Sequence, residues 1–388
     1  MSAPLDNRGV VELLAREADE PGLADQRRRA LRRAARAALA WPEEAHALHA
    51  AGRSLTELRY VGPWLAAKIR AWIEAPPPWV EPPPLRRGFS TVAAANAFLA
   101  GHPDAPVLRG DLQTHTLDSD GTASVEAMAE AAAAEGHEYL AITDHSQGLK
   151  IAHGMDEARL AAQGEEIARV NARLEAVGAR LRVLRAIEMN LSPTGEGDME
   201  PGALRTLDLV LGAFHSKLRT IDDQTERYLA ALAHPAVHVL AHPRGRIFNF
   251  RVGRRAEWRR VFDAAAERDR AVEIDAYPDR QDLDAELLGI ARASGVRISI
   301  GSDAHASYQL RFARLGLASA LAAGIPSGRI LNCMPRDALL TWARDRHAER
   351  GVGYEHEGEY QGAHDRVREQ RRASDGPRAR RGRRSRSA

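Results

Sequence analysis

Several histidines and carboxylates in this chain stand where a short apolar run ends. The run at 209–214 is followed by His215, and the run at 237–241 is followed by His242. Eight residues share this placement, five of them histidines: His115, Asp120, His145, Glu188, His215, His242, Asp303 and His305. If the runs are parallel strands, their carboxyl ends meet at one face, where we predict that these side chains converge. Imidazole and carboxylate ligands without thiolate suit Zn²⁺, Mn²⁺ or Fe²⁺.

A metal site of this composition predicts hydrolytic chemistry. A shared carboxylate such as Glu188 can hold two cations close together, and such cations stabilise both the attacking and the leaving oxygen of a phosphoryl transfer. Water activated by the metal is then the nucleophile, so no serine or cysteine nucleophile is needed. We predict that Glu188, His215 and Asp303 form the catalytic centre. Asp144 directly precedes His145 and is expected to orient its ring.

The elements that position these residues alternate between strand and helix from residue 107 onward. Seven apolar runs are strand candidates: 108–115, 139–145, 182–190, 208–215, 237–242, 271–277 and 297–303. Helical patterns separate them, which predicts a parallel sheet with right-handed crossovers. Because the polar residues lie at one end of the strands, we expect a closed or nearly closed α/β barrel. The sequence has no glycine-rich dinucleotide or phosphate loop that would favour an open nucleotide-binding sheet.

Residues 1–75 carry a separate helical pattern. Asp6 can cap a first helix, and the arginine-rich stretch at 27–36 gives a basic face that is either a nucleic-acid contact or a solvated surface. At 55–69 a tight turn with Gly62 links two helices, and Pro63 begins the second. This segment resembles a helix-hairpin-helix, which binds DNA backbones without sequence preference.

That resemblance implies DNA contacts from Val61, Gly62 and Lys68. The family's hairpin has two glycines around an apolar residue, and Tyr60 stands at the first of these positions. A side chain there would hinder close approach of a phosphate to the backbone. The alternative is a helical hairpin retained for packing.

Composition sets the remaining boundaries. Prolines at 76–78 and 82–84 indicate a stiff linker over 76–106 that includes a short helix at 91–100. The barrel is expected over 107–350. Residues 351–388 form an Arg-rich tail that we expect to be disordered, either a weak nucleic-acid contact or a solubilising segment. From residue 366 the tail holds ten arginines and two acidic residues, so the rest of the chain is net acidic although the total is +2.

No run is apolar enough to span a membrane, and no signal-peptide pattern begins the chain. The single cysteine, Cys333, excludes an internal disulfide and a thiolate metal site. We therefore expect a cytoplasmic protein with a non-specific DNA partner and no membrane partner; the sequence does not indicate an oligomeric state.

Residues 107–310 resemble the PHP (polymerase and histidinol phosphatase) family of metal-dependent phosphoesterases. Three segments carry this resemblance beside the strand-end residues: Ile-Thr-Asp-His-Ser at 142–146, Leu-Gly-Ala-Phe-His-Ser at 211–216 and Glu-Ile-Asp-Ala-Tyr-Pro-Asp-Arg at 273–280. They are most similar to the PHP domain attached to bacterial family X DNA polymerases. The resemblance implies a distorted (β/α)7 barrel behind a small all-α domain, holding two to three divalent cations (Zn²⁺, Mn²⁺ or Fe²⁺).

The resemblance also implies three ligand groups: His115 with Glu188 and Asp303; Glu188 with His215 and His242; and Asp120 with His145 and His305. The family's first histidine is replaced by Gln113, whose neutral amide oxygen is a weaker ligand for such metals. Basic residues near the ligands are expected to contact phosphate: Lys150, Lys217, Arg244 and Arg246.

Residues 1–75 resemble the N-terminal lyase-type domain of the same polymerases, but the linker leaves no room for a polymerase palm. We therefore expect no nucleotide polymerisation. The predicted function is hydrolysis of phosphodiester bonds at DNA 3′ ends, as a 3′–5′ exonuclease or an end-trimming step of DNA repair. Two alternatives stay open: a small-molecule phosphatase of the histidinol-phosphatase type, and a catalytically weakened PHP module that binds DNA, which Gln113 favours.

Overall fold

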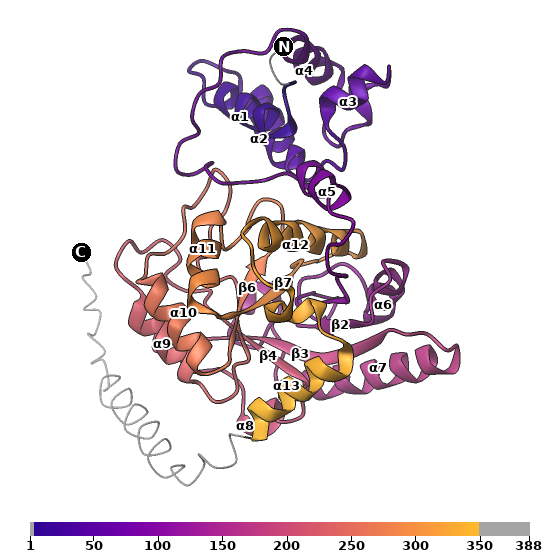
Figure 1. Ribbon diagram of the computed structural model, residues 1–388, viewed down its shortest axis with the longest axis vertical. Coiled ribbons are helices and arrows are strands. Elements are labelled where there is room, and N and C mark those ends of the chain that lie inside the picture. Colours follow the sequence, from indigo (N-terminus) through magenta and orange to yellow (C-terminus); the bar gives the residue numbers. More distant parts are fainter. Residues whose placement is uncertain (1–3, 349–388) are drawn as a thin grey trace, which may run out of the picture. The chain divides into compact units, whose positions relative to one another are not determined.

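The barrel is built from seven parallel strands, each paired with the next along the chain (Figure 1). The computed structural model describes residues 4–348 of the 388. The strands are β1 (Gly110–Asp111), β2 (Tyr139–Ile142), β3 (Arg182–Asn190), β4 (Leu209–Ala213), β5 (Val239–Leu240), β6 (Ala271–Asp275) and β7 (Arg297–Gly301). Beyond β1 and β7 the ring nearly closes, because His115 N donates to Ala304 O at 2.8 Å and Asp303 N donates to Gln113 O at 3.1 Å. The predicted parallel, nearly closed barrel is confirmed.

Helices before, between and after the strands pack around the barrel. They are α5 (Val92–Ala100), α6 (Val125–Ala134), α7 (Glu157–Ala176), α8 (Pro201–Leu204), α9 (Thr225–Ala233), α10 (Trp258–Glu267), α11 (Ala285–Ser294), α12 (Ala313–Ala322) and α13 (Arg336–Ala348). Every residue of β2, β4 and β6 is buried, as expected for strands with both faces covered. Side-chain caps mark several helix starts; Ser124, for example, accepts from Ala127 N at the beginning of α6.

Asn332 forms hydrogen bonds to both the first and the last strand of the barrel. It follows β7 in sequence and is fully buried. Its amide nitrogen donates to Gly110 O at 2.9 Å and to Ile300 O at 2.8 Å, and its Oδ1 accepts from Ile300 N at 2.7 Å. One side chain therefore satisfies backbone groups of both β1 and β7, where regular strand pairing between them is missing.

The N-terminal region is all helical, as predicted. It contains α1 (Asn7–Ala18), α2 (Asp25–Ala38), α3 (Ala45–Ala50) and α4 (Pro63–Glu74). Asp6 caps α1 by accepting from Gly9 N at 2.8 Å. These helices bury a hydrophobic cluster of their own, with Leu14, Leu31 and Trp41 almost without solvent contact. The domain limits 1–75, 76–106 and 107–350 remain predictions.

The described chain up to Ala343 forms one compact unit, in which side chains of the helical region contact the barrel. Arg36, for example, pairs with Asp279, and the rings of Phe89 and Phe248 meet edge to face at 5.3 Å. Among the described residues, no helix is both long and apolar enough to cross a lipid bilayer. The Arg-rich tail at 351–388 lies outside the described residues.

Candidate metal centre

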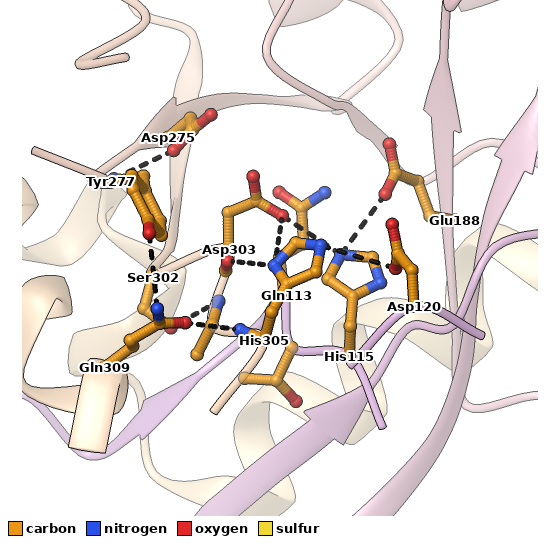
Figure 2. A network of polar contacts seen from close by, with 12 residues as sticks. Gln113, His115, Asp120, Glu188, Asp275, Tyr277, Ser302, Asp303, His305 and Gln309 are labelled. Atoms are coloured by element: carbon orange, nitrogen blue, oxygen red, sulfur yellow. Dashed lines mark hydrogen bonds and ion pairs between the residues drawn. The ribbon is translucent and has the colours of Figure 1, made fainter. Parts of the chain in front are cut away.

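All nine predicted ligand positions come together at the carboxyl ends of the strands. Figure 2 shows six of them: Gln113, His115, Asp120, Glu188, Asp303 and His305. Gln113 and His115 follow β1, and Asp120 lies in the loop before α6. Glu188 belongs to β3, whose last residues extend beyond β2 and pair with β4. The other ligand positions follow strands directly: His145 after β2, His215 after β4, His242 after β5, and Asp303 and His305 after β7. The alternation of strand and helix thus delivers each side chain to one face of the barrel.

Glu188 lies at the centre of this arrangement and is fully buried. Its Oε1 is 2.7 Å from His242 Nε2 and 3.0 Å from His215 Nε2. Its Oε2 is 3.2 Å from His145 Nδ1 and 3.4 Å from His115 Nε2. Each carboxylate oxygen therefore faces a different pair of imidazoles, which is the arrangement that a carboxylate shared between two cations requires.

A second group of ligands adjoins the first. His115 Nε2 lies 3.0 Å from Asp303 Oδ1. Asp120 Oδ1 lies 3.3 Å from His305 Nε2 and 3.6 Å from His145 Nε2. Two sets of donor atoms within the described chain lie within 4.8 Å of one another: His115, Asp120, His145 and His305; and His145, Glu188 and His215. His145 belongs to both sets, so the two groups are contiguous.

Hydrogen bonds outside the cluster orient two of the histidine rings. His215 Nδ1 is 3.1 Å from Asn190 Oδ1, and His305 Nδ1 is 2.8 Å from Asp303 O. In the neutral form of each ring, an Nδ1–H that donates to these oxygens leaves Nε2, which faces the carboxylates, free to bind a metal ion. Such contacts are the usual means of fixing the tautomer of a metal-binding histidine.

Unsatisfied buried atoms show that the donor set fits a metal ion. Within the described part of the chain, Glu188 Oε2, both amide atoms of Gln113 and both ring nitrogens of His115 are buried without a hydrogen-bond partner. Buried polar atoms are rarely left in this state. Of these atoms, His115 Nε2 and Glu188 Oε2 lie 3.4 Å apart. Imidazole and carboxylate donors, with one amide oxygen and no thiolate, match the preferences of Zn²⁺, Mn²⁺ and Fe²⁺.

The charges of the cluster are strongly coupled. Burial opposes ionisation of Glu188, but His145 and His242 outweigh it and hold the pKa of this carboxyl well below its usual range. Burial also lowers the pKa of His242, yet Glu188 reverses this and raises it to about 10. By the same balance the pKa of His305 rises to about 9, chiefly through Asp303. Protons on these rings occupy the place of positive charge that a divalent cation would take, so metal binding releases protons.

Gln113 is fully buried and faces the cluster, beside Asp303 and His305 (Figure 2). Gly301 makes room for it, because a Cβ at that position would lie 2.6 Å from Gln113 Cβ. Glu273 adjoins the same glycine. Burial raises the pKa of Glu273 well above its usual value, which favours its neutral form. Gln113 therefore presents a neutral oxygen where an imidazole would present nitrogen.

The carboxylate of Asp144 hydrogen-bonds to the loop that carries Asp120, and not to His145 as we expected. Asp144 accepts hydrogen bonds from Thr116 N at 2.7 Å, Thr116 Oγ1 at 2.6 Å, Gln163 Nε2 at 2.6 Å and the Ser119 hydroxyl. The expectation that it orients His145 is therefore replaced by a different one. Asp144 holds the segment from Thr116 to Ser119, and thereby positions Asp120.

Arg280 and Asp275 are site residues that the sequence reasoning missed. Arg280 Nε lies 3.5 Å from Asp303 Oδ2 and 3.9 Å from Asp275 Oδ2, and its side chain is 37 % exposed. Burial, together with the charge of Asp303, raises the pKa of Asp275 well above its usual value. Both residues belong to the segment at 273–280 that indicated the family, and its strand-end position was the signal that could have identified them.

The four basic residues predicted to contact phosphate have different surroundings. Lys150 and Lys217 are exposed. Arg244 pairs with Asp284. Arg246 is 4 % exposed; it pairs with Asp284 at 3.1 Å, donates to the carbonyls of Arg280 and Gly88, and lies over the Phe89 ring at 3.8 Å. Because all these contacts are internal, the structure contradicts the phosphate role predicted for Arg246.

The residues predicted to contact DNA in the hairpin also differ in accessibility. Gly62 is exposed at the start of α4, and a Cβ placed there would meet nothing within 4 Å. Val61 has a buried side chain, and its N–H donates to Leu58 O. Lys68 pairs with Glu17 at 2.7 Å and lies over Trp64 and Trp72. Of the three, only Gly62 presents an open backbone edge.

Comparison with known proteins agrees with this geometry. A model of the PHP domain matches residues 111–274. The chain is 34 % identical over 226 residues to "DNA polymerase/3'-5' exonuclease PolX" of Bacillus subtilis; the match covers 58 % of this chain and 39 % of that protein, so the chain spans well under half of that relative. It is 31 % identical over 219 residues to a "Probable phosphatase" of Acetivibrio thermocellus, covering 53 % of this chain and 83 % of the relative.

A solved structure of histidinol phosphate phosphatase from Lactococcus lactis, complexed with zinc, L-histidinol and phosphate, aligns with a TM-score of 0.41 and 16 % identity. That alignment covers 56 % of this chain and 95 % of the other. The converging ligands, the domain match and the extent of the phosphatase match lead to one conclusion: this chain belongs to the PHP family of metal-dependent phosphoesterases.

Proposed function

We propose that this chain is a metal-dependent phosphodiesterase that removes nucleotides from the 3′ ends of DNA. The observation that carries the hydrolytic part is Glu188, whose two oxygens face separate pairs of histidines. The DNA part is supported by the similarity to the Bacillus subtilis exonuclease. It is supported further by α2, whose sequence from Arg27 to Arg36 is arginine-rich.

Glu188, Asp303 and His215 have different roles in the proposed reaction. Glu188 and Asp303 stay ionised at neutral pH, because neighbouring charges hold the pKa of each carboxyl below its usual range despite burial. They supply the negative charge that retains cations. Zn²⁺ or Mn²⁺ bound there would act as Lewis acids on the phosphate and lower the pKa of a bound water. His215 is partly exposed and faces Glu188, so it lies on the side from which a phosphate can enter.

Arg280 is the candidate for binding the phosphate itself. Its guanidinium is beside Asp303, partly exposed, and has five N–H donors, of which only some can face the two neighbouring carboxylates. Guanidinium groups bind phosphate oxygens in a planar, two-point geometry. We propose that Arg280 orients the scissile phosphate over the metal centre.

A direct test uses the full chain, Mn²⁺ and a DNA primer labelled at its 5′ end. The proposal predicts a ladder of products shortened from the 3′ end, and no ladder from the His215→Ala variant. An intact primer, together with rapid release of phosphate from small monoesters, would contradict it.

A small-molecule phosphatase is the second candidate function. It is favoured by the match to the Acetivibrio thermocellus "Probable phosphatase", of which this chain covers 83 %. If the chain is a small-molecule phosphatase, a variant lacking the exposed arginines of α2 will hydrolyse p-nitrophenyl phosphate as fast as the native chain does. For the DNA function the same variant would lose activity on the primer, because phosphate backbones are bound largely through such charges.

A further inference from the structure

Tyr60 occupies a backbone conformation that favours glycine. Its φ is +64°, in the left-handed region, where a side chain costs about 1 kcal/mol. The ring is 48 % exposed, so burial of the ring does not offset that cost. A large aromatic residue held in this conformation at the surface of a hairpin is a feature that packing alone does not explain.

Arginines lie near the rings of two exposed tyrosines, Tyr60 and Tyr308. Arg33 lies 5.4 Å from the ring centroid of Tyr60, and Arg59 lies 5.0 Å from the same ring. Arg59 also reaches the barrel, where it lies 5.5 Å from the ring of Tyr308 and donates to its hydroxyl at 2.9 Å. Arg311 lies 5.9 Å from Tyr308 on the barrel side. We call these five residues (Arg33, Tyr60, Arg59, Tyr308 and Arg311) the Arg–Tyr ladder.

The ladder ends beside the metal centre. Tyr308 is three residues beyond His305 and is 46 % exposed. The side chain of Gln309 joins the two positions: its Oε1 accepts from His305 N at 2.7 Å, and its Nε2 lies 3.3 Å from the Tyr308 hydroxyl (Figure 2 shows Gln309 and His305). A ligand lying along the ladder would therefore reach the ligand loop that follows β7.

The ladder's arginines carry positive charge that the described chain does not neutralise. Arg33, Arg59 and Arg311 are all exposed, and among the residues from 4 to 348 none of them forms an ion pair with a carboxylate. By contrast, Arg32 and Arg36 of the same helix pair with Asp19 and Asp279. Exposed aromatic rings interleaved with unpaired arginines are the surface that single-stranded nucleic acids bind, through base stacking and phosphate contacts.

We propose that the Arg–Tyr ladder binds the single-stranded 3′ end of DNA and leads it from the helical region to the metal centre. Bases stack on Tyr60 and Tyr308, and the arginines contact the intervening phosphates. This inference rests on the proposed function, since it names the substrate form that the same site receives. Tyr60 stands at the first glycine position of the helix-hairpin-helix pattern. In this proposal its ring stacks on a base, whereas a glycine there would let a phosphate approach the backbone.

The test measures binding separately from hydrolysis. The full chain carrying His215→Ala is titrated against 5′-fluorescein-labelled oligo(dT) of twelve nucleotides at fixed salt, and fluorescence anisotropy gives the affinity. Tyr60→Ala and Tyr308→Ala are each expected to weaken binding by about 5- to 150-fold, the range for loss of one stacked base. Tyr60→Phe and Tyr308→Phe keep the rings and are expected to retain affinity within a factor of about three.

Trp79→Ala is the matched control. Trp79 is also exposed, at 54 %, and also lies under an arginine, Arg8 at 5.6 Å, but it is outside the ladder. Its removal is expected to leave oligo(dT) affinity unchanged. Equal affinities for Tyr60→Ala, Tyr308→Ala and Trp79→Ala would overturn the proposal.

Tyr60→Gly separates stacking from packing. Glycine accepts the left-handed φ without strain, so the unfolding midpoint of this variant is expected to stay the same or to rise, while oligo(dT) affinity falls as in Tyr60→Ala. Tighter binding by Tyr60→Gly would mean that the hairpin grips phosphate through its backbone, and the ladder would be rejected. Release of p-nitrophenol from bis(p-nitrophenyl) phosphate by the chain with native His215 reports the hydrolytic function independently, so a failed ladder and a failed phosphodiesterase give different results.

Discussion

Oε1 of Glu188 lies 2.7 Å from Nε2 of His242, and both side chains are buried. Since the other carboxylate oxygen faces His145 and His115, the negative charge of Glu188 is shared by the whole cluster. Replacing this residue therefore affects every ligand group, which makes it the first position to test.

Glu188→Gln keeps the shape of the side chain and removes its charge. We expect at least two equivalents of divalent metal per native chain, a lower metal content in the variant, and a fall in turnover of about 100-fold or more, because several kcal/mol of charge stabilisation are lost. Elemental analysis of the purified protein and the primer assay measure the two effects. Glu165→Gln, at a side chain that is 79 % exposed, is the control and is expected to change neither.

Gln113→His replaces a neutral amide oxygen with an imidazole nitrogen. Imidazole is the better ligand for Zn²⁺, so this variant is expected to retain Zn²⁺ against a competing chelator about 10- to 100-fold more strongly than the native chain, the scale seen when groups around a metal site are altered. Gln113→Ala is expected to retain less than the native chain. Equal retention by all three would mean that position 113 does not contact the metal.

Asp144→Asn tests the buried contacts to the loop that carries Asp120. One acceptor oxygen becomes a donor that faces other donors, so we expect the free energy of unfolding to fall by roughly 2–4 kcal/mol. Turnover should fall as well, because Asp120 loses its fixed position. Urea denaturation and the primer assay measure these effects. Thr116→Ser keeps the hydroxyl that donates to Asp144 at 2.6 Å and should resemble the native chain.

Arg280→Met removes the proposed phosphate contact. A hydrogen bond to a charged group contributes about 1.5–3 kcal/mol, so KM for a phosphodiester is expected to rise by about 10- to 150-fold, with a smaller change in kcat. The KM of Arg280→Lys should lie between that of the native chain and that of Arg280→Met, because lysine keeps the charge without the planar group. Arg169→Met, at an exposed arginine outside the site, is the control. An unchanged KM for Arg280→Met would remove Arg280 from phosphate binding.

His137 makes stability depend on pH outside the metal centre. Burial lowers the pKa of its imidazole to about 4, below the usual 6.5. Between these values the unfolded chain binds more protons than the folded one, so this histidine's contribution is retained above pH 6.5 and lost as the pH falls toward 4. The loss at pH 5 relative to pH 7 is about 2 kcal/mol.

His137→Leu should lack that loss. The measurement is the free energy of unfolding from urea titrations at pH 7 and pH 5, with chelator present in both, so that protonation of the metal ligands affects native and variant chains alike. A variant with the same pH dependence as the native chain would show that folding does not change the pKa of His137.

The strands, and the convergence of the proposed ligand positions, could be predicted because their signals are local. Most strands are apolar runs, and β2, β4 and β6 are buried on both faces. Each proposed ligand stands next to such a run or within a few residues of it, as His215 follows Phe214. The barrel follows from the alternation of these runs with helices. Such features survive in the sequence because they depend on neighbours in the chain and on strand pairing in sequence order.

The roles of individual charged side chains could not be predicted in the same way. Arg246 follows a ligand strand closely, yet it is buried by Phe89 and paired with Asp284, residues distant in the sequence. Asp144 precedes a ligand but bonds to Thr116 and Gln163. Arg280 lies beside Asp303, which follows another strand. An arginine or aspartate extends to whichever partner the fold brings near, and spacing alone does not specify that partner.

Because Asn332 connects the first and last strands, the metal centre can form only late in the synthesis of the chain. The hydrogen bonds of Asn332 to Gly110 and Ile300 join the first and last strands, and the ligands are drawn from nearly the whole span between them. A chain still emerging from the ribosome presents His115 and Glu188 well before Asp303 and Asn332 exist. The metal centre is therefore assembled only when the barrel is nearly completely translated, and a nascent, partly folded chain lacks a complete set of ligand positions.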